Sequence, residues 1–202
     1  MSGVSNVPSR RRLLILAACL LASPVSWAAD WTVAGHTYDE QATVAGEKLV
    51  LNGAGVRSVL MYQFFTAGLY VKQPSRDGQR LMADTGARRL RMRMLVEVSS
   101  EEFVKASRGG IQKRASPDLQ SQLAARMDRF DAQVRTMGTL KKNDTVDLDY
   151  LPGRGLQMSV NQKVVAGEPI AGNDFFAALL DIYIGDRPVD AKLKAGLLGS
   201  KP

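Results

Sequence analysis

Cysteine and histidine are nearly missing from this chain, which contains one of each in 202 residues. Cys19 lies in an N-terminal leader, so the rest of the chain can form no disulfide, thiol nucleophile or thiolate metal site. His36 stands in no Gly-x-Ser-x-Gly setting and in no cluster of metal-ligating residues. This argues against a serine-hydrolase triad and against a catalytic zinc site. We therefore expect neither a metal nor a cofactor.

A long apolar run is missing as well. The run LLILAACLLA at 13–22 falls well short of the roughly 20 residues that a membrane-spanning helix needs. It follows three arginines at 10–12 and precedes Ser26-Trp27-Ala28, which is the pattern of a secretory signal peptide with its cleavage site. We expect residues 1–28 to be a signal peptide, the protein to be periplasmic or secreted, and no stable membrane span to remain after cleavage.

Two variants of this leader stay open. Residues 9–14, SRRRLL, resemble a twin-arginine export motif, which would mean export of the folded protein. Residues 16–19, LAAC, resemble a lipoprotein cleavage box, but apolar residues follow Cys19 directly, where a lipoprotein normally becomes polar. We therefore favour export without lipidation.

The chain also lacks a strong excess of one charge. Residues 1–28 contain three arginines and no acid, so that the net charge of +7 falls to +4 without them. Arg89, Arg91 and Arg93 alternate with apolar residues, and no aromatic side chain lies between them on which a base could stack. We interpret them, like Asp147 and Asp149, as the solvated face of a strand. No nucleic-acid partner is expected.

Apolar periodicity divides the chain after the leader into the strands and helices of one domain, 29–202. Residues 31–47 form a polar lead-in, and residues 58–63 are expected to turn a hairpin. Strands are predicted within 48–71, 88–98, 144–151, 155–161 and 162–167, and helices within 99–109, 116–138, 173–185 and 189–198. This order has no β-α-β alternation, so it predicts an α+β fold in which an antiparallel sheet carries helices on one side.

Capping residues mark the expected helix starts. Ser99 and Glu102 form a capping box, Ser116 precedes a proline at the first helical position, and Asn173 and Asp174 precede the apolar run FFAALL. In contrast, GAG at 53–55 is a lone Gly-x-Gly with no third glycine and no helix after it, which indicates a tight strand connection and not a dinucleotide loop.

Arg57 is the one charged residue in the apolar segment 51–71, LNGAGVRSVLMYQFFTAGLYV. On a strand it shares a face with Val59 and Met61, and the other face is largely apolar as well. Because a buried charge without its partner costs ~3–5 kcal/mol, Arg57 needs a carboxylate, a set of carbonyls or an anionic ligand. The alternative is an arginine at a strand edge that extends to solvent.

The segment around Arg57 resembles the chalcone isomerase family. Members have a glycine-rich turn with Gly-x-Arg, here 55–57, then after a hairpin a Phe-Thr-Ala run, here 65–67, and Gly-x-Tyr, here 68–70. Residues 173–198 resemble the closing helices of the family, so that the likeness covers about residues 45–200. The resemblance implies an open-faced β-sandwich, in which a large antiparallel sheet is packed by a layer of α-helices, with a ligand cleft between them.

The resemblance also implies roles for single residues. In the plant isomerases the arginine orients a phenolate for ring closure, with help from a threonine, a tyrosine and an asparagine. Members without isomerase activity bind fatty acids, with the arginine on the carboxylate. Arg57 matches this arginine. Thr66 matches the threonine only when one residue is skipped before Gly68; otherwise Phe65 takes the place, and a slip of one residue reverses the face.

Three polar groups of the isomerases have no counterpart in this sequence. The tyrosine falls near Phe103, the asparagine near Gly110, and a late serine or threonine near Phe176. Because positioned donors each contribute several kcal/mol to stabilising a transition state, their loss should cripple isomerisation. Apolar replacements instead suit an acyl chain, with one charged group among apolar walls.

We therefore expect a non-catalytic, exported protein that binds a small amphipathic carboxylate such as a fatty acid, or a polyphenol. Arg57 pairs with the anionic group, and Thr66 or Tyr70 adds a hydrogen bond. A first alternative is a weak intramolecular lyase of the chalcone isomerase type, with Arg57 as its catalytic electrophile and a water as proton carrier. A second is a scaffold protein with an empty cleft, in which Arg57 pairs with an internal carboxylate such as Glu47 or Asp147.

Overall fold

The structure is a computed structural model that describes residues 1–3 and 31–201. The predicted signal peptide, residues 1–28, lies outside the described residues apart from its first three, so its prediction stays a prediction.

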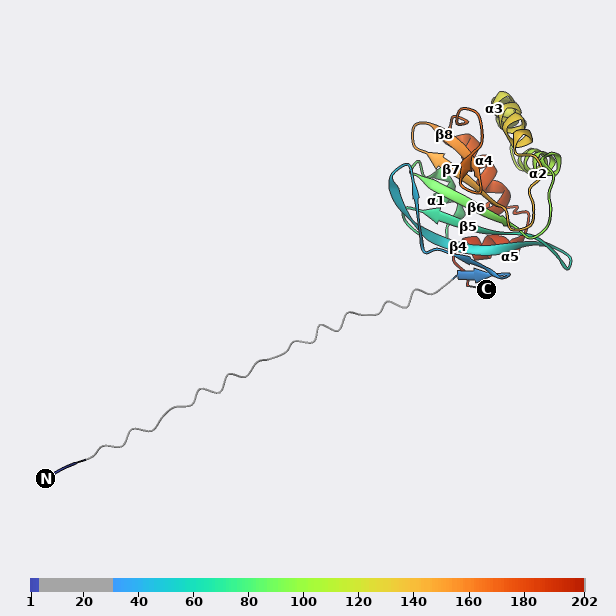
Figure 1. The fold of residues 1–202 in the computed structure, drawn as a ribbon. Helices are drawn as coiled ribbons and strands as arrows, with labels where there is room; N and C mark the ends of the chain where they lie inside the picture. Colours follow the sequence, from blue (N-terminus) through green and yellow to red (C-terminus); the bar gives the residue numbers. More distant parts are fainter. Residues whose placement is uncertain (4–30, 202) are drawn as a thin grey trace.

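A seven-stranded antiparallel sheet forms the centre of the domain (Figure 1). Its strands follow one another in space in their order along the chain, so that each pairs with the next. They are β3 (Gln41–Val44), β4 (Glu47–Val59), β5 (Tyr62–Val71), β6 (Arg88–Met94), β7 (Thr145–Leu151), β8 (Gly155–Val160) and β9 (Lys163–Val164). The predicted hairpin near 58–63 is confirmed, because β4 and β5 are joined at Val59 and Tyr62.

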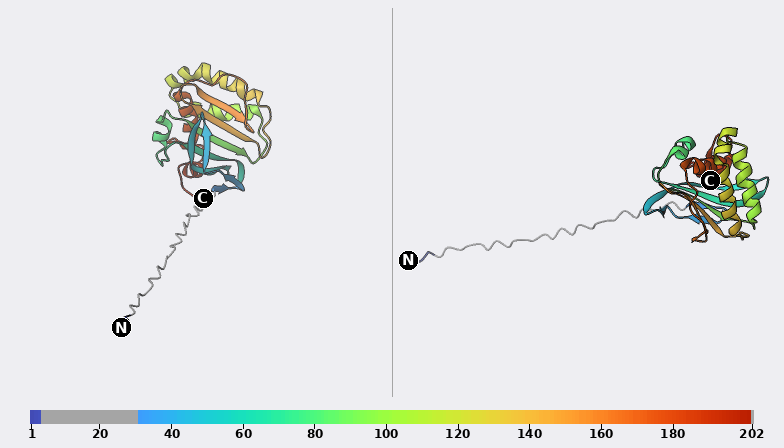
Figure 2. Two further views of the ribbon diagram at one scale, coloured as in Figure 1. Left: turned by 60° about the vertical axis from the view of Figure 1, so that its left-hand side comes forward. Right: turned by 90° about the horizontal axis from the view of Figure 1, so that it is seen from above.

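Five helices pack on one face of this sheet, as Figure 2 shows for the larger ones. They are α1 (Gly78–Ala83), α2 (Ser100–Gln112), α3 (Pro117–Thr136), α4 (Asn173–Ile184) and α5 (Ala191–Leu197). Side chains from all five share one apolar core with the strand residues that face them, such as Ala67, Leu69 and Leu90. The predicted α+β fold, with an antiparallel sheet packed by a helix layer, is confirmed.

Local capping chemistry explains where the longer helices begin. The capping box of Ser99 and Glu102 starts α2, and Ser116 caps α3 with a proline after it, both as predicted. The prediction of an Asn173 or Asp174 cap for α4 was wrong, because Gly172 occupies the N-cap position without a side-chain hydrogen bond. The two side chains are held by arginines from elsewhere in the chain instead.

The predicted polar lead-in at 31–47 is structured. It forms β1 (Trp31–Val33) and β2 (His36–Tyr38), a separate two-stranded hairpin, and then β3 at the edge of the main sheet. Tyr38 is buried and packs on the sheet face opposite the helices, directly over Gly68. A Cβ at Gly68 would lie 2.6 Å from the Tyr38 ring, so the absence of a side chain at Gly68 leaves room for Tyr38 to pack against the sheet. A second, smaller core results.

Arg89, Arg91 and Arg93 of β6 are half-buried on that same face, and the prediction of a solvated strand face was wrong. Arg91 donates two hydrogen bonds to the Asp147 carboxylate, at 2.7 and 2.8 Å, and Arg89 donates two to Asp149, at 2.6 and 2.7 Å. Paired cross-strand in register, these charges compensate one another under the N-terminal hairpin. Charge pairing replaces solvation here.

Gly53 and Gly55 lie inside β4 and not in a strand connection, contrary to the prediction. A Cβ at Gly53 would lie 2.1 Å from the Gly196 carbonyl oxygen, and one at Gly55 would lie 3.1 Å from that of Leu193. Both glycines therefore let the backbone of α5 approach β4 closely. This places the start of α5 beside Arg57.

Candidate functional site

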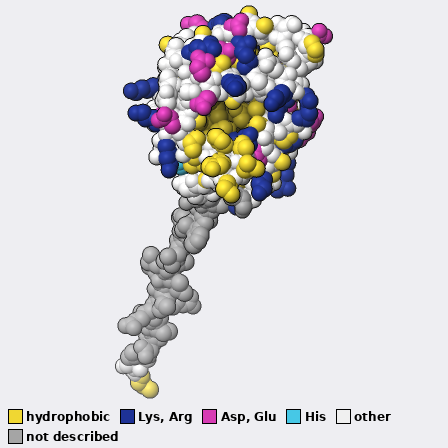
Figure 3. Space-filling model, turned by 90° about the vertical axis from the view of Figure 1, so that its right-hand side faces the viewer, with side chains coloured by type: hydrophobic (Ala, Val, Ile, Leu, Met, Phe, Trp, Pro, Cys, Tyr) yellow, Lys and Arg dark blue, Asp and Glu magenta, His cyan; other side chains and the backbone are white. Residues whose placement is uncertain are grey.

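A largely apolar cavity of about 310 Å³ opens between the sheet and helices α2 and α4, at the end of the sheet where the β4–β5 hairpin turns. In Figure 3 apolar side chains gather around a hollow on this side of the molecule. The lining residues are Arg57, Val59, Phe64, Phe65, Met92, Met94, Val96, Glu97, Val98, Glu102, Phe103, Ala106, Ser107, Ile182, Tyr183 and Val189.

Strand register turns Arg57 into this cavity. Arg57 lies opposite Phe65 on β5, which in turn lies opposite Met94 on β6, and paired residues share a face of the sheet. A register shift follows Arg57 directly, between Arg57 and Ser58. The guanidinium therefore faces the helix layer, and its side chain is only 19% exposed.

Asp190 is the acidic neighbour of Arg57. Its Oδ2 lies 3.5 Å from Arg57 Nη1 and also accepts the backbone N–H of Ser58 at 3.0 Å. Its Oδ1 caps α5 by accepting the N–H groups of Lys192 and Leu193. Burial raises the pKa of Asp190, but the backbone hydrogen bonds and the Arg57 charge outweigh burial and lower it below its ordinary value. Asp190 is thus a carboxylate whose charge is shared among four donors.

Arg57 keeps free hydrogen-bonding capacity. Its Nη1 donates to the Ser58 carbonyl and contacts Asp190, whereas Nε and Nη2 donate to no residue that the structure describes. A long contact with a shared carboxylate neutralises the guanidinium only in part. Two donor nitrogens, Nε and Nη2, therefore remain for an anionic group in the cavity.

Tyr183 on α4 is the second polar group that lines the cavity. Its ring packs edge-to-face on Phe65, with centroids 6.3 Å apart, and its hydroxyl bonds to none of the described residues. Burial raises the pKa of Tyr183 to about 12, although the nearby charges of Arg57 and Arg114 act in the opposite direction. The phenol is therefore neutral at physiological pH and can donate a hydrogen bond close to the Arg57 guanidinium.

The remaining polar residues of the lining do not add a metal site or a second cation. Glu102 is held in the capping box of α2, where it accepts from the backbone and hydroxyl of Ser99. Within residues 31–201, no group of three or more metal-ligating side chains comes together. The cavity accordingly offers one cation, one phenol, the Ser107 hydroxyl and the carboxylates of Glu97 and Glu102 among largely apolar walls.

The structure does not bring Thr66 and Tyr70 to Arg57. Both lie on the opposite face of β5, where Thr66 bonds to the Tyr38 hydroxyl at 2.7 Å and to His36 at 3.0 Å. Tyr70 lies in the small core against Arg91, 6.0 Å from ring centroid to guanidinium carbon. Phe65 takes the cavity position instead, because β5 alternates strictly from Phe65 to Val71.

Glu47 and Asp147, the partners that the scaffold alternative expected for Arg57, pair elsewhere. Glu47 accepts from Lys72 at 3.0 Å, and Asp147 pairs with Arg91 on the far face of the sheet. The prediction of these partners was wrong, since Asp190 takes the role. In the sequence, the position of Asp190 directly before AKLKAGL predicts a helix cap. No local pattern predicts its contact with Arg57, which lies 133 residues earlier in the chain.

Two of the three apolar replacements lie outside the cavity lining. Phe103 lines the cavity, as the alignment with the isomerase tyrosine would require. Phe176 is fully buried against Tyr150, and Gly110 lets α2 approach Ile182 of α4, where a Cβ would be 2.7 Å from the Ile182 side chain. Sequence reasoning missed Tyr183, whose signal was a tyrosine in an otherwise apolar helix end.

Comparisons with known proteins agree with this architecture. A family model described as chalcone isomerase-like matches residues 29–199. The crystal structure of a fatty-acid binding protein from Arabidopsis thaliana is similar in fold, with a TM-score of 0.60 and 16% sequence identity. The alignment covers 82% of this chain and 92% of that one. A comparison with curated protein sequences returned no match.

Proposed function

We propose that this chain, which belongs to the chalcone isomerase-like family, binds a fatty acid or a similar amphipathic carboxylate without transforming it. The carboxylate pairs with Arg57 and accepts a hydrogen bond from Tyr183, and the acyl chain lies along the apolar wall. The similarity in fold to a plant fatty-acid binding protein supports this class of ligand.

The observation that carries the proposal is the state of Arg57. A guanidinium in a largely apolar cavity, with Nε and Nη2 bonded to no described residue, can donate hydrogen bonds to an anion. Charge-assisted hydrogen bonds to a carboxylate are stronger than neutral ones, and arginine offers them in parallel pairs. The rest of the lining matches a hydrocarbon, because most of its residues are apolar.

Direct binding tests the proposal. Native mass spectrometry of freshly purified protein should reveal a co-purified lipid, and titration with fatty acids of increasing length should show saturable binding. Arg57→Ala should abolish that binding while the fold survives, because Asp190 keeps its three backbone donors. Arg93→Ala is the matched control, since Arg93 lies on the same sheet but faces away from the cavity.

Two outcomes would overturn the proposal. Binding of fatty acid by the Arg57→Ala protein as tight as by the parent would show that the guanidinium does not hold the carboxylate. Loss of a hydroxychalcone's absorbance faster with the protein than in buffer would instead support the lyase alternative, in which Arg57 acts on a phenolate.

We infer that the protein works outside the cytoplasm, after cleavage of residues 1–28. The inference rests on the arginines at 10–12, the apolar run at 13–22 and the Ser26-Trp27-Ala28 site. The intact mass of protein recovered from the exported fraction should correspond to a chain that starts at Ala29. A chain that keeps residues 1–28 in the cytoplasm would contradict the inference.

A further inference from the structure

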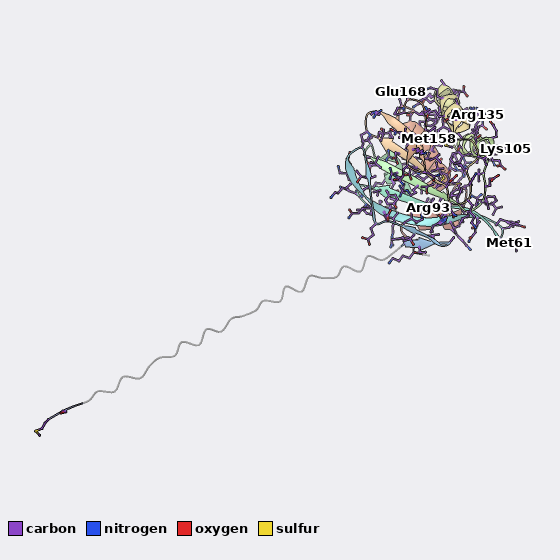
Figure 4. All side chains as sticks on the ribbon, viewed as in Figure 1. Met61, Arg93, Lys105, Arg135, Met158 and Glu168 are labelled. Atoms are coloured by element: carbon purple, nitrogen blue, oxygen red, sulfur yellow. The ribbon has the colours of Figure 1, made fainter. Side chains whose placement is uncertain are left out.

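The tip of the β4–β5 hairpin carries large apolar side chains into solvent. Leu60 is 94% exposed, Met61 86% and Tyr62 68%. In Figure 4 Met61 lies at the far end of the hairpin, away from the body of the domain. Single exposed apolar residues are common on proteins, but three in succession at a projecting tip are an unusual patch that needs an explanation.

Turn chemistry does not provide that explanation. Val59 pairs with Tyr62, so Leu60 and Met61 form a two-residue loop, and Leu60 has a φ of 55°. Such a loop favours glycine, asparagine or aspartate where φ is positive, because a larger side chain is strained there. The chain thus has leucine and methionine where folding alone would favour small or polar residues.

The apolar tip continues into the rim of the cavity. Val59, Phe64, Val96 and Val189 line the cavity and are still 36–43% exposed. In the view of Figure 3, apolar side chains form a continuous surface inside the hollow and below it. The tip and the cavity mouth therefore form one apolar surface, which we call the hairpin patch (Val59–Tyr62, Phe64, Val96 and Val189).

Exposed lysines flank the hairpin patch on two sides. The backbone N–H of Leu95 donates to the Phe64 carbonyl, and the N–H of Asn143 donates to the carbonyl of Met94. These two bonds place Lys141 and Lys142, which shortly precede Asn143 in the chain, at the same end of the sheet as the hairpin. On the other side, Asp190 accepts the Ser58 N–H, which places Lys192 in the first turn of α5 beside the hairpin. The nearby acids Asp144, Asp190 and Glu102 are already hydrogen-bonded, which leaves Glu97, beside Val96, as the rim acid that bonds to no described residue.

We propose that the hairpin patch docks on the surface of an anionic lipid bilayer. Leu60 and Met61 enter the boundary between headgroups and acyl chains, Tyr62 lies at headgroup level, and the flanking lysines pair with lipid phosphates. A projecting two-residue loop suits a bilayer, which yields around it, better than a protein partner, which needs ~800 Å² of matched surface on each side. No helix in the described part of the chain is both long and apolar enough to cross a membrane.

This docking goes beyond the proposed function and rests on the hairpin and its lysines alone. It would hold whether or not the cavity accepts a fatty acid, because the residues that insert differ from Arg57 and Tyr183. If both proposals hold, the cavity mouth lies against the bilayer from which a poorly soluble ligand would come.

Vesicle flotation tests the docking. Two kinds of vesicle are used, one of phosphatidylcholine alone and one of equimolar phosphatidylcholine and phosphatidylglycerol. The parent and all variants are purified from the exported fraction with the same N-terminus, so any contribution of residues 4–30 is common to them. Leu60→Gly/Met61→Ser suits the loop as it stands and should fold at least as stably as the parent. Val164→Ser, on β9 at the opposite edge of the sheet, is the control, since Val164 is 59% exposed.

We expect the parent and Val164→Ser to float with the anionic vesicles, and the hairpin double variant to bind about tenfold more weakly or worse, the factor that corresponds to withdrawing one or two large apolar side chains. Flotation of the double variant equal to that of the parent, or no flotation of the parent, would overturn the proposal. Equal binding to the two kinds of vesicle would overturn its electrostatic part. A dimer that the double variant abolishes, without vesicle binding, would assign the patch to a second copy instead.

Discussion

Arg57 lies 3.5 Å from Asp190, but the same Asp190 oxygen accepts the Ser58 N–H at the shorter distance of 3.0 Å. The carboxylate therefore accepts backbone hydrogen bonds from the start of α5 and the end of β4, and these bonds are shorter than its contact with the guanidinium. This arrangement holds Arg57 in place while leaving its charge incompletely matched, which is what an anion-binding cavity requires.

Asp190→Asn should tighten the binding of a fatty acid. Asparagine can keep the cap of α5 through its amide oxygen, but its amide nitrogen replaces the oxygen that accepts the Ser58 N–H, so the stability should fall by ~1–3 kcal/mol. Removal of the competing charge should raise the affinity about two- to fivefold, the factor for a partly exposed ion pair. Isothermal titration calorimetry measures this. Asp190→Ala, which also removes the cap, should lose ~1 kcal/mol of stability more than the Asn variant. Weaker binding by the Asn variant would show that Asp190 aids the ligand and does not compete with it.

Tyr183→Phe should weaken fatty-acid binding about tenfold, because a hydrogen bond to a charged group is lost. The stability should stay nearly unchanged, since the Tyr183 hydroxyl bonds to no described residue. Tyr62→Phe is the matched control, because Tyr62 lies at the exposed hairpin tip. Parent-like affinity in the Tyr183 variant would remove this phenol from the binding site.

Stability should fall in alkaline solution between about pH 10 and 12. Burial raises the pKa of Tyr183 and of Tyr70 to about 12, and raises that of Tyr38 as well. The unfolded chain releases these protons near pH 10. Above that pH the unfolded state binds fewer protons than the folded one, so the stability present below pH 10 is lost as pH rises. Urea unfolding across this range should show the fall, and Tyr183→Phe should reduce its slope. An unchanged slope in the variant would contradict the burial of this phenol.

Gly53→Ala and Gly109→Ala should have opposite effects. A Cβ at Gly53 would lie 2.1 Å from a backbone oxygen of α5, so the substitution should cost ~1–3 kcal/mol as the helix is displaced. Gly109 lies within α2 with nothing within 4 Å of its Cβ position, so alanine should stabilise the helix by ~0.5–1 kcal/mol. Thermal unfolding measures both. Equal stability of the two variants would mean that α5 does not pack on β4 as described.

Local patterns in the sequence predicted the elements well. Alternation, the capping box of Ser99 and Glu102, and the break between Val59 and Tyr62 act over a few residues. The structure has each of them, although the strand predicted within 88–98 ends at Met94. The short polar strands at 31–47 were missed, because their side chains gain burial only from the distant Gly68 and Tyr70. The pairing of Arg89 and Arg91 with Asp149 and Asp147 likewise depends on which strands become neighbours.

The candidate site shows the same division. The sequence by itself singled out Arg57, because one charge in an apolar strand must find a partner, and it determined the α+β class through the order of its periodic segments. The residue that shares a face with Arg57 depends instead on strand pairing, because a single-residue change of register exchanges Thr66 for Phe65. Asp190 and Tyr183 become neighbours of Arg57 only in the folded chain, since the positions of the two C-terminal helices depend on long-range packing.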